Sequence, residues 1–307
     1  MSDANRPDFP KNLMEFEERF HSEEACRKYL FSQRWPEGFR CPQGGHGHGW
    51  LNKRWLMECS NCHQQTSLTA GTSMHGTRKP LLMWFRAMWW VCTQKPGVSA
   101  AGLKRILGLK STQTAWTWLH KLRRAMIRAG REKLSGRVQL DDAFIGGEEP
   151  EVAGRQSLKK ARIAVAVEIK EAGRGLGRIR IQRVVDFSAS SLVSFTIDNV
   201  EPGTIIETDG WSGYNPLEEM GFTRVILRAK DSPENPLHHV NRVVSLLKRW
   251  LLGTHQGRVS KKHLQHYLDE LVFRHNRRKS KDVGLLFQRM LKQSAETRHT
   301  PYKSLVT

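Results

Sequence analysis

The chain has 307 residues, 38% of them apolar, and carries a formal net charge of +20. This length accommodates two or three domains with cores of their own. The positive excess is spread along the whole sequence, which favours nucleic acid over a membrane surface as the partner. No segment approaches the roughly 18 apolar residues of a membrane span. The N-terminus lacks the apolar core of a signal peptide, so we expect a cytoplasmic protein.

The first part of the chain combines predicted helices with clustered cysteines. Apolar residues at helical spacing predict helices over residues 13–34, with a break where Ser22 can cap the second helix. Five cysteines, an odd number with three of them clustered, favour a metal site over disulfides. Cys26 and Cys92 fall on apolar helical faces, and we interpret them as core residues.

The clustered cysteines have the spacing of a zinc ribbon. Cys59 and Cys62 form a CxxC knuckle whose thiolates can both reach one Zn²⁺, and Cys41 supplies a third ligand. Gly44 stands where a second cysteine of the partner knuckle is expected. His46 or His48 could complete the site, and His46 gives the more compact loop. The alternative is a decayed ribbon whose remaining thiols are ordinary buried cysteines.

Residues 80–130 read as helices, the last two of them a candidate DNA-binding pair. Pro80 opens a helix predicted over residues 81–93, whose aromatic stripe favours core packing. Ser99 can cap a short helix that Gly108 ends, and Ser111-Thr112-Gln113 can cap a second helix over residues 114–129. In a helix-turn-helix the second helix enters the major groove with its N-terminus first. The DNA-binding candidates are therefore Gln113, Thr114, Thr117, Lys121, Arg123 and Arg124. A basic helical hairpin with a purely structural role is the alternative.

The second half of the chain has the element order of an α/β fold. Strands are predicted over residues 138–145, 161–169 and 178–185, a helix over 188–199, and a strand over 204–207. This β-β-β-α-β order, followed by a helix, is that of the ribonuclease-H-like fold.

Two acidic positions fall on these strands. In the first strand, period-two alternation sends Asp141 to one face and Asp142 to the other. Asp209 lies at the carboxyl end of the last strand, where ligands collect in open α/β sheets. A carboxylate on a fixed strand suits a hard cation. Taken alone, each position would be an ordinary turn aspartate.

A helix predicted over residues 239–252 supplies a third group. Asn241 and Lys248 are two helical turns apart and face the same way, and Arg249 adds to the basic face. A metal-binding side chain with a phosphate-binding lysine below it suits a DNA-cutting site. Without the acidic strands, the same helix would read as an ordinary amphipathic helix.

Long blocks, in a fixed order, carry a further signal. They are RWPEGFRCP at 34–42, QTSLTAGT at 65–72, TAW at 114–116, LDDAFIGG at 140–147, TDGWSGY at 208–214, SLLKR at 245–249, GTH at 253–255, HL at 263–264, YLDE at 267–270 and FRHNRR at 273–278. Together they resemble the ISXO2-like group of bacterial insertion-sequence transposases over most of the chain. The resemblance implies a DDE-type site on a ribonuclease-H-like fold that binds two divalent ions, Mg²⁺ or Mn²⁺.

The resemblance assigns roles to particular residues. Asp141 matches the first acid, Asp209 the second, and Lys248 the lysine of the family motif. Asn241 falls where many relatives have Glu, and the family includes groups with Asn there. His239 is a rival third ligand, and Glu234 lies too close to two prolines to be favoured.

The implied protein is an insertion-sequence transposase acting at the bacterial nucleoid. It would bind terminal inverted repeats, cleave strands and transfer them into target DNA, as a homodimer on double-stranded DNA. The alternative is a DNA-binding remnant or regulator without activity, and a hydrolytic nuclease is a third option. We expect helices and the ribbon over residues 1–94, a helix-turn-helix over 95–134, the catalytic domain over 135–280, and a helix with a tail over 281–307.

Overall fold

The computed structural model describes residues 8–128, 130–147, 149–150, 156–157, 159–170, 175–228, 236–257 and 259–306. The chain divides into two compact units. The terminal unit contains the residues up to Arg128 together with those from Ser280 onward, and the sheet unit contains the stretch between them. Among the helices that the structure describes, none has both the length and the apolar character needed to span a membrane.

The terminal unit joins the two ends of the chain. Its elements are α1 (Leu13–Arg19), α2 (Glu23–Arg34), β1 (Gly49–Leu51), β2 (Leu56–Cys59), β3 (Gln65–Ser67), α3 (Leu81–Thr93), α4 (Ala100–Leu107), α5 (Thr112–Ala125), α9 (Val283–Glu296) and α10 (Tyr302–Val306). The three strands form an antiparallel sheet in the order β1-β2-β3. The Ser22 hydroxyl accepts a hydrogen bond from Ala25 N–H, which confirms the predicted cap of α2.

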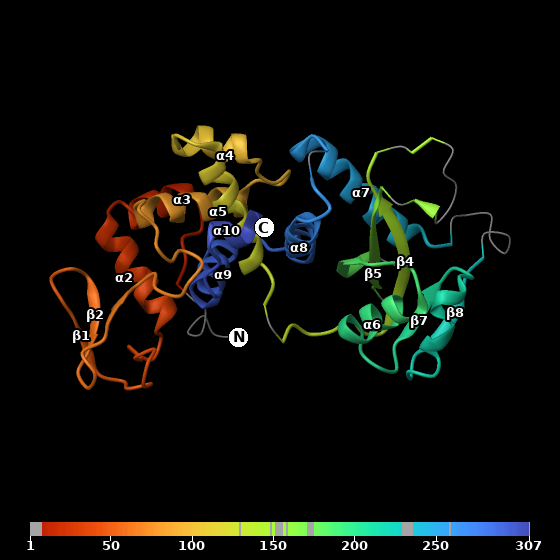
Figure 1. Cartoon of the computed structure of the whole chain (residues 1–307), viewed down its shortest axis with the longest axis horizontal. Helices are drawn as coiled ribbons and strands as arrows, with labels where there is room; N and C mark the ends of the chain where they lie inside the picture. Colours follow the sequence, from red (N-terminus) through yellow and green to blue (C-terminus); the bar gives the residue numbers. More distant parts are fainter. Residues whose placement is uncertain are drawn as a thin grey trace. The chain divides into compact units, whose positions relative to one another are not determined.

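The C-terminal helix α9 fills the core of the terminal unit. Phe287 of α9 is fully buried and touches the rings of Phe16, Phe20, Phe85 and Trp89 at centroid distances of 5.3 to 5.8 Å. Figure 1 shows α9 beside α3 and α5, although α9 is far from both in the sequence. The segment expected as a helix and a tail therefore belongs to this core, because Phe287 completes an aromatic cluster that α1 and α3 begin. Its last residues form α10, with Leu305 buried.

One glycine permits this packing. The backbone of Pro10 lies so close to Gly284 that a Cβ there would collide with it. Gly284 is thus required by the close approach of the two chain ends rather than by a turn.

The sheet unit contains a single mixed sheet in the order β6-β5-β4-β7-β8. Its elements are β4 (Arg137–Ile145), β5 (Ala161–Ile169), β6 (Leu176–Val184), α6 (Ala189–Asn199), β7 (Ile205–Thr208), the 3₁₀ helix η4 (Ser212–Leu217), β8 (Thr223–Ile226), α7 (His238–His255) and α8 (Leu264–Asn276). Strands β4, β5 and β6 are antiparallel neighbours, while β7 pairs in parallel with both β4 and β8. The unit therefore has the ribonuclease-H-like fold that the element order predicts. The edge strand β8 was not predicted.

The central strand β4 separates two cores. Val138 and Leu140 pack with α6, η4 and β7, in the first core. Asp141 pairs across the ladder with Val165, which belongs to the second core, between the sheet and α7 and α8. Side chains alternate along a strand, so Asp141 lies on the α7–α8 face and Asp142 on the α6 face, as predicted.

Helix α8 protects the free edge of β6. The Asn276 side chain accepts from Ile179 N–H at 2.7 Å and donates to the Ile179 carbonyl at 3.1 Å. Gln265 accepts from Arg183 N–H at 2.8 Å. These amides occupy backbone groups that an edge strand otherwise offers to another chain.

Candidate functional sites

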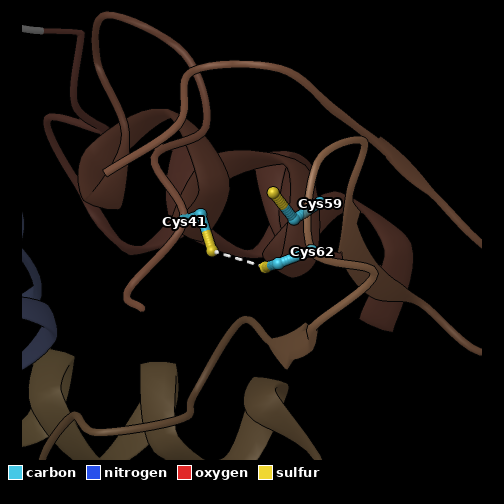
Figure 2. Close-up of side chains that lie close together, drawn as sticks. All are labelled: Cys41, Cys59 and Cys62. Atoms are coloured by element: carbon cyan, nitrogen blue, oxygen red, sulfur yellow. Dashed lines mark hydrogen bonds between the residues drawn. The ribbon is translucent and has the colours of Figure 1, made fainter. Parts of the chain in front are cut away.

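Three cysteines meet at the ribbon. Cys59 ends β2, Cys62 follows it in the knuckle, and Cys41 lies in the turn before β1. All three sulfurs lie within 4.8 Å of one another, and the Cys41 and Cys62 Sγ atoms, which face each other in Figure 2, are 3.6 Å apart. Tetrahedral Zn²⁺ with bonds of about 2.3 Å separates its sulfur ligands by about 3.8 Å. Backbone N–H groups of Gly44 and Gln43 lower the pKa of the Cys41 thiol. The cluster therefore fits zinc.

The fourth ligand predicted for this site lies outside the cluster. The His46 Nε2 atom is 3.2 Å from Ser60 Oγ, inside the knuckle, and His46 is not one of the group formed by the three sulfurs. Its carbonyl accepts from Cys41 N–H at 2.9 Å, so the backbone keeps His46 beside the cysteines. His48 lies next to it, with ring centroids 5.6 Å apart. His46 as a zinc ligand stays a prediction.

The two aspartates of the sheet unit hold matching positions on neighbouring parallel strands, with Asp141 on β4 and Asp209 directly after β7. Residues 137, 138 and 139 of β4 pair with residues 205, 206 and 207 of β7. Asp141 and Asp209 have the same offset, two residues beyond the last of these pairs. Adjacent strands lie about 4.8 Å apart, so this register places the two residues side by side at the point where β7 ends.

Local hydrogen bonds orient both carboxylates. Asp141 Oδ1 accepts from Asp142 N–H at 2.8 Å, and Asp209 Oδ1 accepts from Trp211 N–H at 3.0 Å. Asp142 lies on the other face, where the Tyr214 hydroxyl contacts it at 3.4 Å. Of the adjacent pair, Asp141 is thus the one on the same face as α7.

Arg224 of β8 holds the turn that carries Asp209. Its guanidinium donates to Thr208 Oγ1 at 2.9 Å and to the carbonyls of Asp209 and Trp211, each at 3.1 Å. Burial lowers the pKa of Arg224. Gly213 is required in the same turn because a Cβ there would meet the Trp211 ring. The unpredicted strand β8 therefore positions one of the acids.

Gln139 joins β4 to the start of α7. Its Oε1 accepts from His239 N–H at 3.1 Å and Val240 N–H at 3.2 Å, so the side chain binds the first turn of the helix. Its Nε2 donates to Glu207 Oε2 at 3.0 Å and to the Pro236 carbonyl at 3.2 Å. Gln139 and Glu207 are 2% and 1% exposed, and Arg137 pairs with the same Glu207 carboxylate.

This network places Asn241 in the first turn of a helix that is tied to β4 two residues from Asp141. The continuous helix α7 keeps Asn241 and Lys248 on nearly one azimuth. Asn241 is half-buried, while Lys248 and Arg249 are exposed. His239, the rival ligand, lies on the same turn, and burial lowers the pKa of its imidazole. Glu234 lies outside the described residues.

The helix pair α4–α5 has the predicted caps. Ser99 Oγ accepts from Gly102 N–H, Gly108 is left-handed with φ 61°, and Ser111 Oγ accepts from Gln113 N–H. Helix α5 ends at Ala125, earlier than predicted. Of its candidates, Gln113 and Arg124 are exposed.

The other candidates on α5 are less accessible. Arg123 is 1% exposed, which corrects its assignment to DNA contact: it follows Leu119 by four residues and shares that buried stripe. Lys121 is half-buried, and burial lowers the pKa of its ammonium. Thr114 and Thr117 are half-buried, and the Thr117 hydroxyl donates to the Gln113 carbonyl at 2.8 Å.

Two known protein-domain families match this chain. The ISXO2-like transposase domain matches residues 133–276, and the transposase zinc-ribbon domain of the same group matches residues 21–65, together more than half of the chain. The chain belongs to the ISXO2-like transposases. It is also similar to an uncharacterised protein in the transposable element ISH50 of Halobacterium salinarum, with 25% identity over 81% of this chain and 89% of the relative.

Solved structures similar to this transposase include retroviral proteins. The catalytic core domain of BIV integrase has 18% identity and a TM-score of 0.33, covering 48% of this chain and 86% of its own. A simian T-cell lymphotropic virus intasome, in complex with the PP2A regulatory subunit B56 gamma, has 15% identity and a TM-score of 0.30, covering 61% and 67%.

Sequence reasoning about this transposase missed the residues that position the site. Gln139 and Glu207 sit in strands as isolated polar residues, and Arg224 lies in a strand that was not predicted. One signal was available: Gln139 and Glu207 occupy the same faces as Asp141 and Asp209, each two residues earlier.

Proposed function

We propose that this transposase binds the terminal inverted repeats of its element and catalyses divalent-metal-dependent cleavage and transfer of DNA strands. The observation that supports the proposal most directly is the shared register of Asp141 and Asp209, beside a helix whose first turn Gln139 ties to the same strand. Enzymes that cut and join DNA with divalent metal ions need such fixed oxygen donors at one point.

The donor set suits Mg²⁺ or Mn²⁺. Asp141, Asp209 and Asn241 offer carboxylate and amide oxygens, the ligands that hard cations prefer. Asp141, Asp209 and Asn241 would hold the two ions, with Asp141 and Asp209 as charged ligands and Asn241 as a neutral one. When bound, such ions lower the pKa of an attacking water and neutralise charge on the scissile phosphate.

Asn241 gives the site one negative charge fewer than a glutamate would. An amide oxygen is a neutral ligand, so the second ion should bind more weakly than at an all-carboxylate site. Half-burial of Asn241 and the anchoring of its helix by Gln139 reduce the entropic cost of holding the amide in place.

The remaining residues act on the DNA. Lys248 would neutralise a phosphate next to the site, and no general-base side chain is required. The 3′-hydroxyl freed by strand cleavage would then attack a phosphodiester of the target DNA in line, forming one P–O bond while the P–O bond to the target strand's own 3′-oxygen breaks. The zinc ribbon and the α4–α5 pair would hold the element ends, with Gln113 and Thr114 nearest the bases. Joining two ends favours a homodimer on DNA.

The test is cleavage of a duplex that carries the element's own end, with Mg²⁺ or Mn²⁺, by the wild type, Asp209→Ala and Asn241→Ala. We expect nicking by the wild type alone. If Asn241→Ala still nicks the duplex and Asp209→Ala does not, the third metal ligand would be His239 instead of Asn241. Asn241→Asp, which restores the charge, should lower the Mg²⁺ concentration required for half-maximal nicking.

A DNA-binding protein without activity is the second candidate, because Asn241 and Gly44 both depart from the usual ligand patterns. Binding of the element end without nicking under either metal would favour it. Nicking without joining to a second duplex would instead indicate a hydrolytic nuclease.

A further inference from the structure

The terminal unit contains a cavity of about 500 Å³ between the β1–β2 turn, the first turn of α2 and the segment before α3. Four cationic side chains line it: Arg27, Arg54, Arg78 and Lys79. We infer that this cavity binds the phosphate backbone of double-stranded DNA independently of base sequence. The inference rests on the proposed function and adds to it a contact site outside the α4–α5 pair.

One wall of the cavity is a rigid turn. Asn52 Oδ1 accepts from Arg54 N–H at 3.0 Å and from Leu56 N–H at 3.1 Å, which closes the turn between β1 and β2. Trp55, within it, has a left-handed backbone with φ 61°, a conformation that a bulky residue adopts only when its surroundings enforce it. The Arg27 guanidinium lies 4.8 Å above the Trp55 ring. Arg54 is thereby presented on a fixed support.

The opposite wall is held just as firmly. Thr77 Oγ1 accepts from Lys79 N–H at 3.2 Å and from the Trp84 indole N–H at 2.9 Å, which fixes the segment carrying Arg78 and Lys79 to α3. Ser67 and Leu68 also line the cavity, and the Arg34 guanidinium donates to their carbonyls and to that of Ala70. The backbone around the cavity therefore needs little ordering when a ligand binds.

The cavity is positive despite the carboxylate it contains. Glu23 accepts from Leu81 N–H at 2.9 Å and from Leu82 N–H at 3.2 Å, so it caps the N-terminus of α3. Arg27 lies 3.9 Å from the same carboxylate. Glu23 is thus already compensated, and the exposed charges of Arg54, Arg78 and Lys79 face the ligand side.

The lining chemistry favours phosphate over bases. The hydroxyls of Ser67 and Thr69 also line the cavity, and hydroxyl, guanidinium and ammonium groups all donate to phosphate oxygens. The Thr77 hydroxyl already donates to the Lys79 carbonyl. The ring that could stack on a base, Trp55, carries Arg27 on its face. Such contacts position a duplex without reading its sequence.

The experiment compares two double variants of the full chain that remove the same charge. Arg54→Gln/Arg78→Gln alters the cavity, while Arg40→Gln/Lys53→Gln alters exposed cations of the same ribbon outside it. Binding to a fluorescent 30-base-pair duplex of arbitrary sequence is measured from 50 to 200 mM NaCl. All four side chains are exposed, so zinc content and thermal unfolding should match the wild type.

We expect the cavity variant to bind at least tenfold more weakly and to lose about 1.8 from the slope of log K against log salt, since each phosphate contact contributes about 0.9. The matched variant should change less than twofold. If both variants lose affinity for the duplex equally, or if the cavity variant binds like the wild type, the cavity is not a DNA contact. Either result would leave the proposed function intact. A wild-type chain that binds no duplex would instead overturn the proposed function.

Discussion

The sheet unit and the terminal unit secure their functional residues by different means. In the sheet unit, buried polar side chains do so: Gln139 and Glu207 tie β4, β7 and α7 together beside Asp141 and Asp209. In the terminal unit, an aromatic core supports helices α2, α3 and α5, and its central ring, Phe287, comes from α9, which is distant from them in sequence.

The difference has a physical consequence. The hydrogen bonds of a polar network are directional, so the loss of the network should displace one helix by a small amount. DNA cleavage should therefore be impaired more than the free energy of unfolding is lowered. An aromatic core acts through buried area and packing, so its loss should reduce stability first. The following variants test this contrast, from the largest expected effect to the smallest.

Asp141→Asn should reduce metal-dependent nicking to background while leaving both units folded, because it removes a charged ligand without changing side-chain shape. The measurement is nicking of the element end together with circular dichroism. Asp142→Asn, on the opposite face of β4, is the matched control and should keep most of the activity. Equal losses from both changes would contradict the assignment of Asp141.

Phe287→Ala should destabilise the terminal unit by about 3–5 kcal/mol, the usual cost of removing a buried aromatic ring. Hydrogen exchange of the full chain, read separately over the two units, measures it. Arg289→Ala, at an exposed position of the same helix, should have almost no effect. If hydrogen exchange became faster to the same extent in both units, the two units would not unfold independently of each other.

Gln139→Leu should lower the nicking rate about 10–100-fold, the usual range for residues that orient metal ligands. It should also raise the Mn²⁺ concentration needed for binding, which electron paramagnetic resonance detects without turnover. Gln182→Leu, the same exchange on β6, serves as control. An unchanged Mn²⁺ affinity would mean that Gln139 supports the fold and not the site.

Gly284→Ala should cost the terminal unit about 1–3 kcal/mol, because the Pro10 backbone must move to admit the methyl group. Gly253→Ala, within α7, meets open space and should stabilise the sheet unit by about 0.5–1 kcal/mol. Chemical denaturation of each variant gives the sign of the change in the free energy of unfolding. If both substitutions change it in the same direction, the difference expected between the two glycines would be contradicted.

Arg124→Gln should reduce the salt slope of DNA binding by about 1, as the loss of one phosphate contact does. Arg123→Gln should leave the slope unchanged and lower stability, because Arg123 is buried. Binding titrations at several salt concentrations, with thermal unfolding, separate the two. A slope change in Arg123→Gln would show that α5 rearranges on DNA.

Local patterns were sufficient to predict most of the elements. Ser22, Ser99 and Ser111 cap helices where the sequence predicts, because a cap depends on a few neighbouring residues. The order of strands and helix in the sheet unit followed from periodicity, and from it came the fold and the faces of Asp141 and Asp142. The strand β8 was not predicted because, unlike β7 of the same length, it has no buried residue and therefore no buried apolar face that would mark it in the sequence.

The fold and the candidate ligands of the sheet unit could thus be predicted from the sequence, because the period of each longer element and the order of the elements are local properties of the chain. Tertiary structure alone decided which cations are accessible, burying Arg123 and gathering Arg27, Arg54, Arg78 and Lys79 around one cavity. It also decided that α9, near the end of the sequence, completes the aromatic core of the terminal unit. The physical reason is that burial and long-range packing depend on contacts between distant segments, which no local period or spacing records.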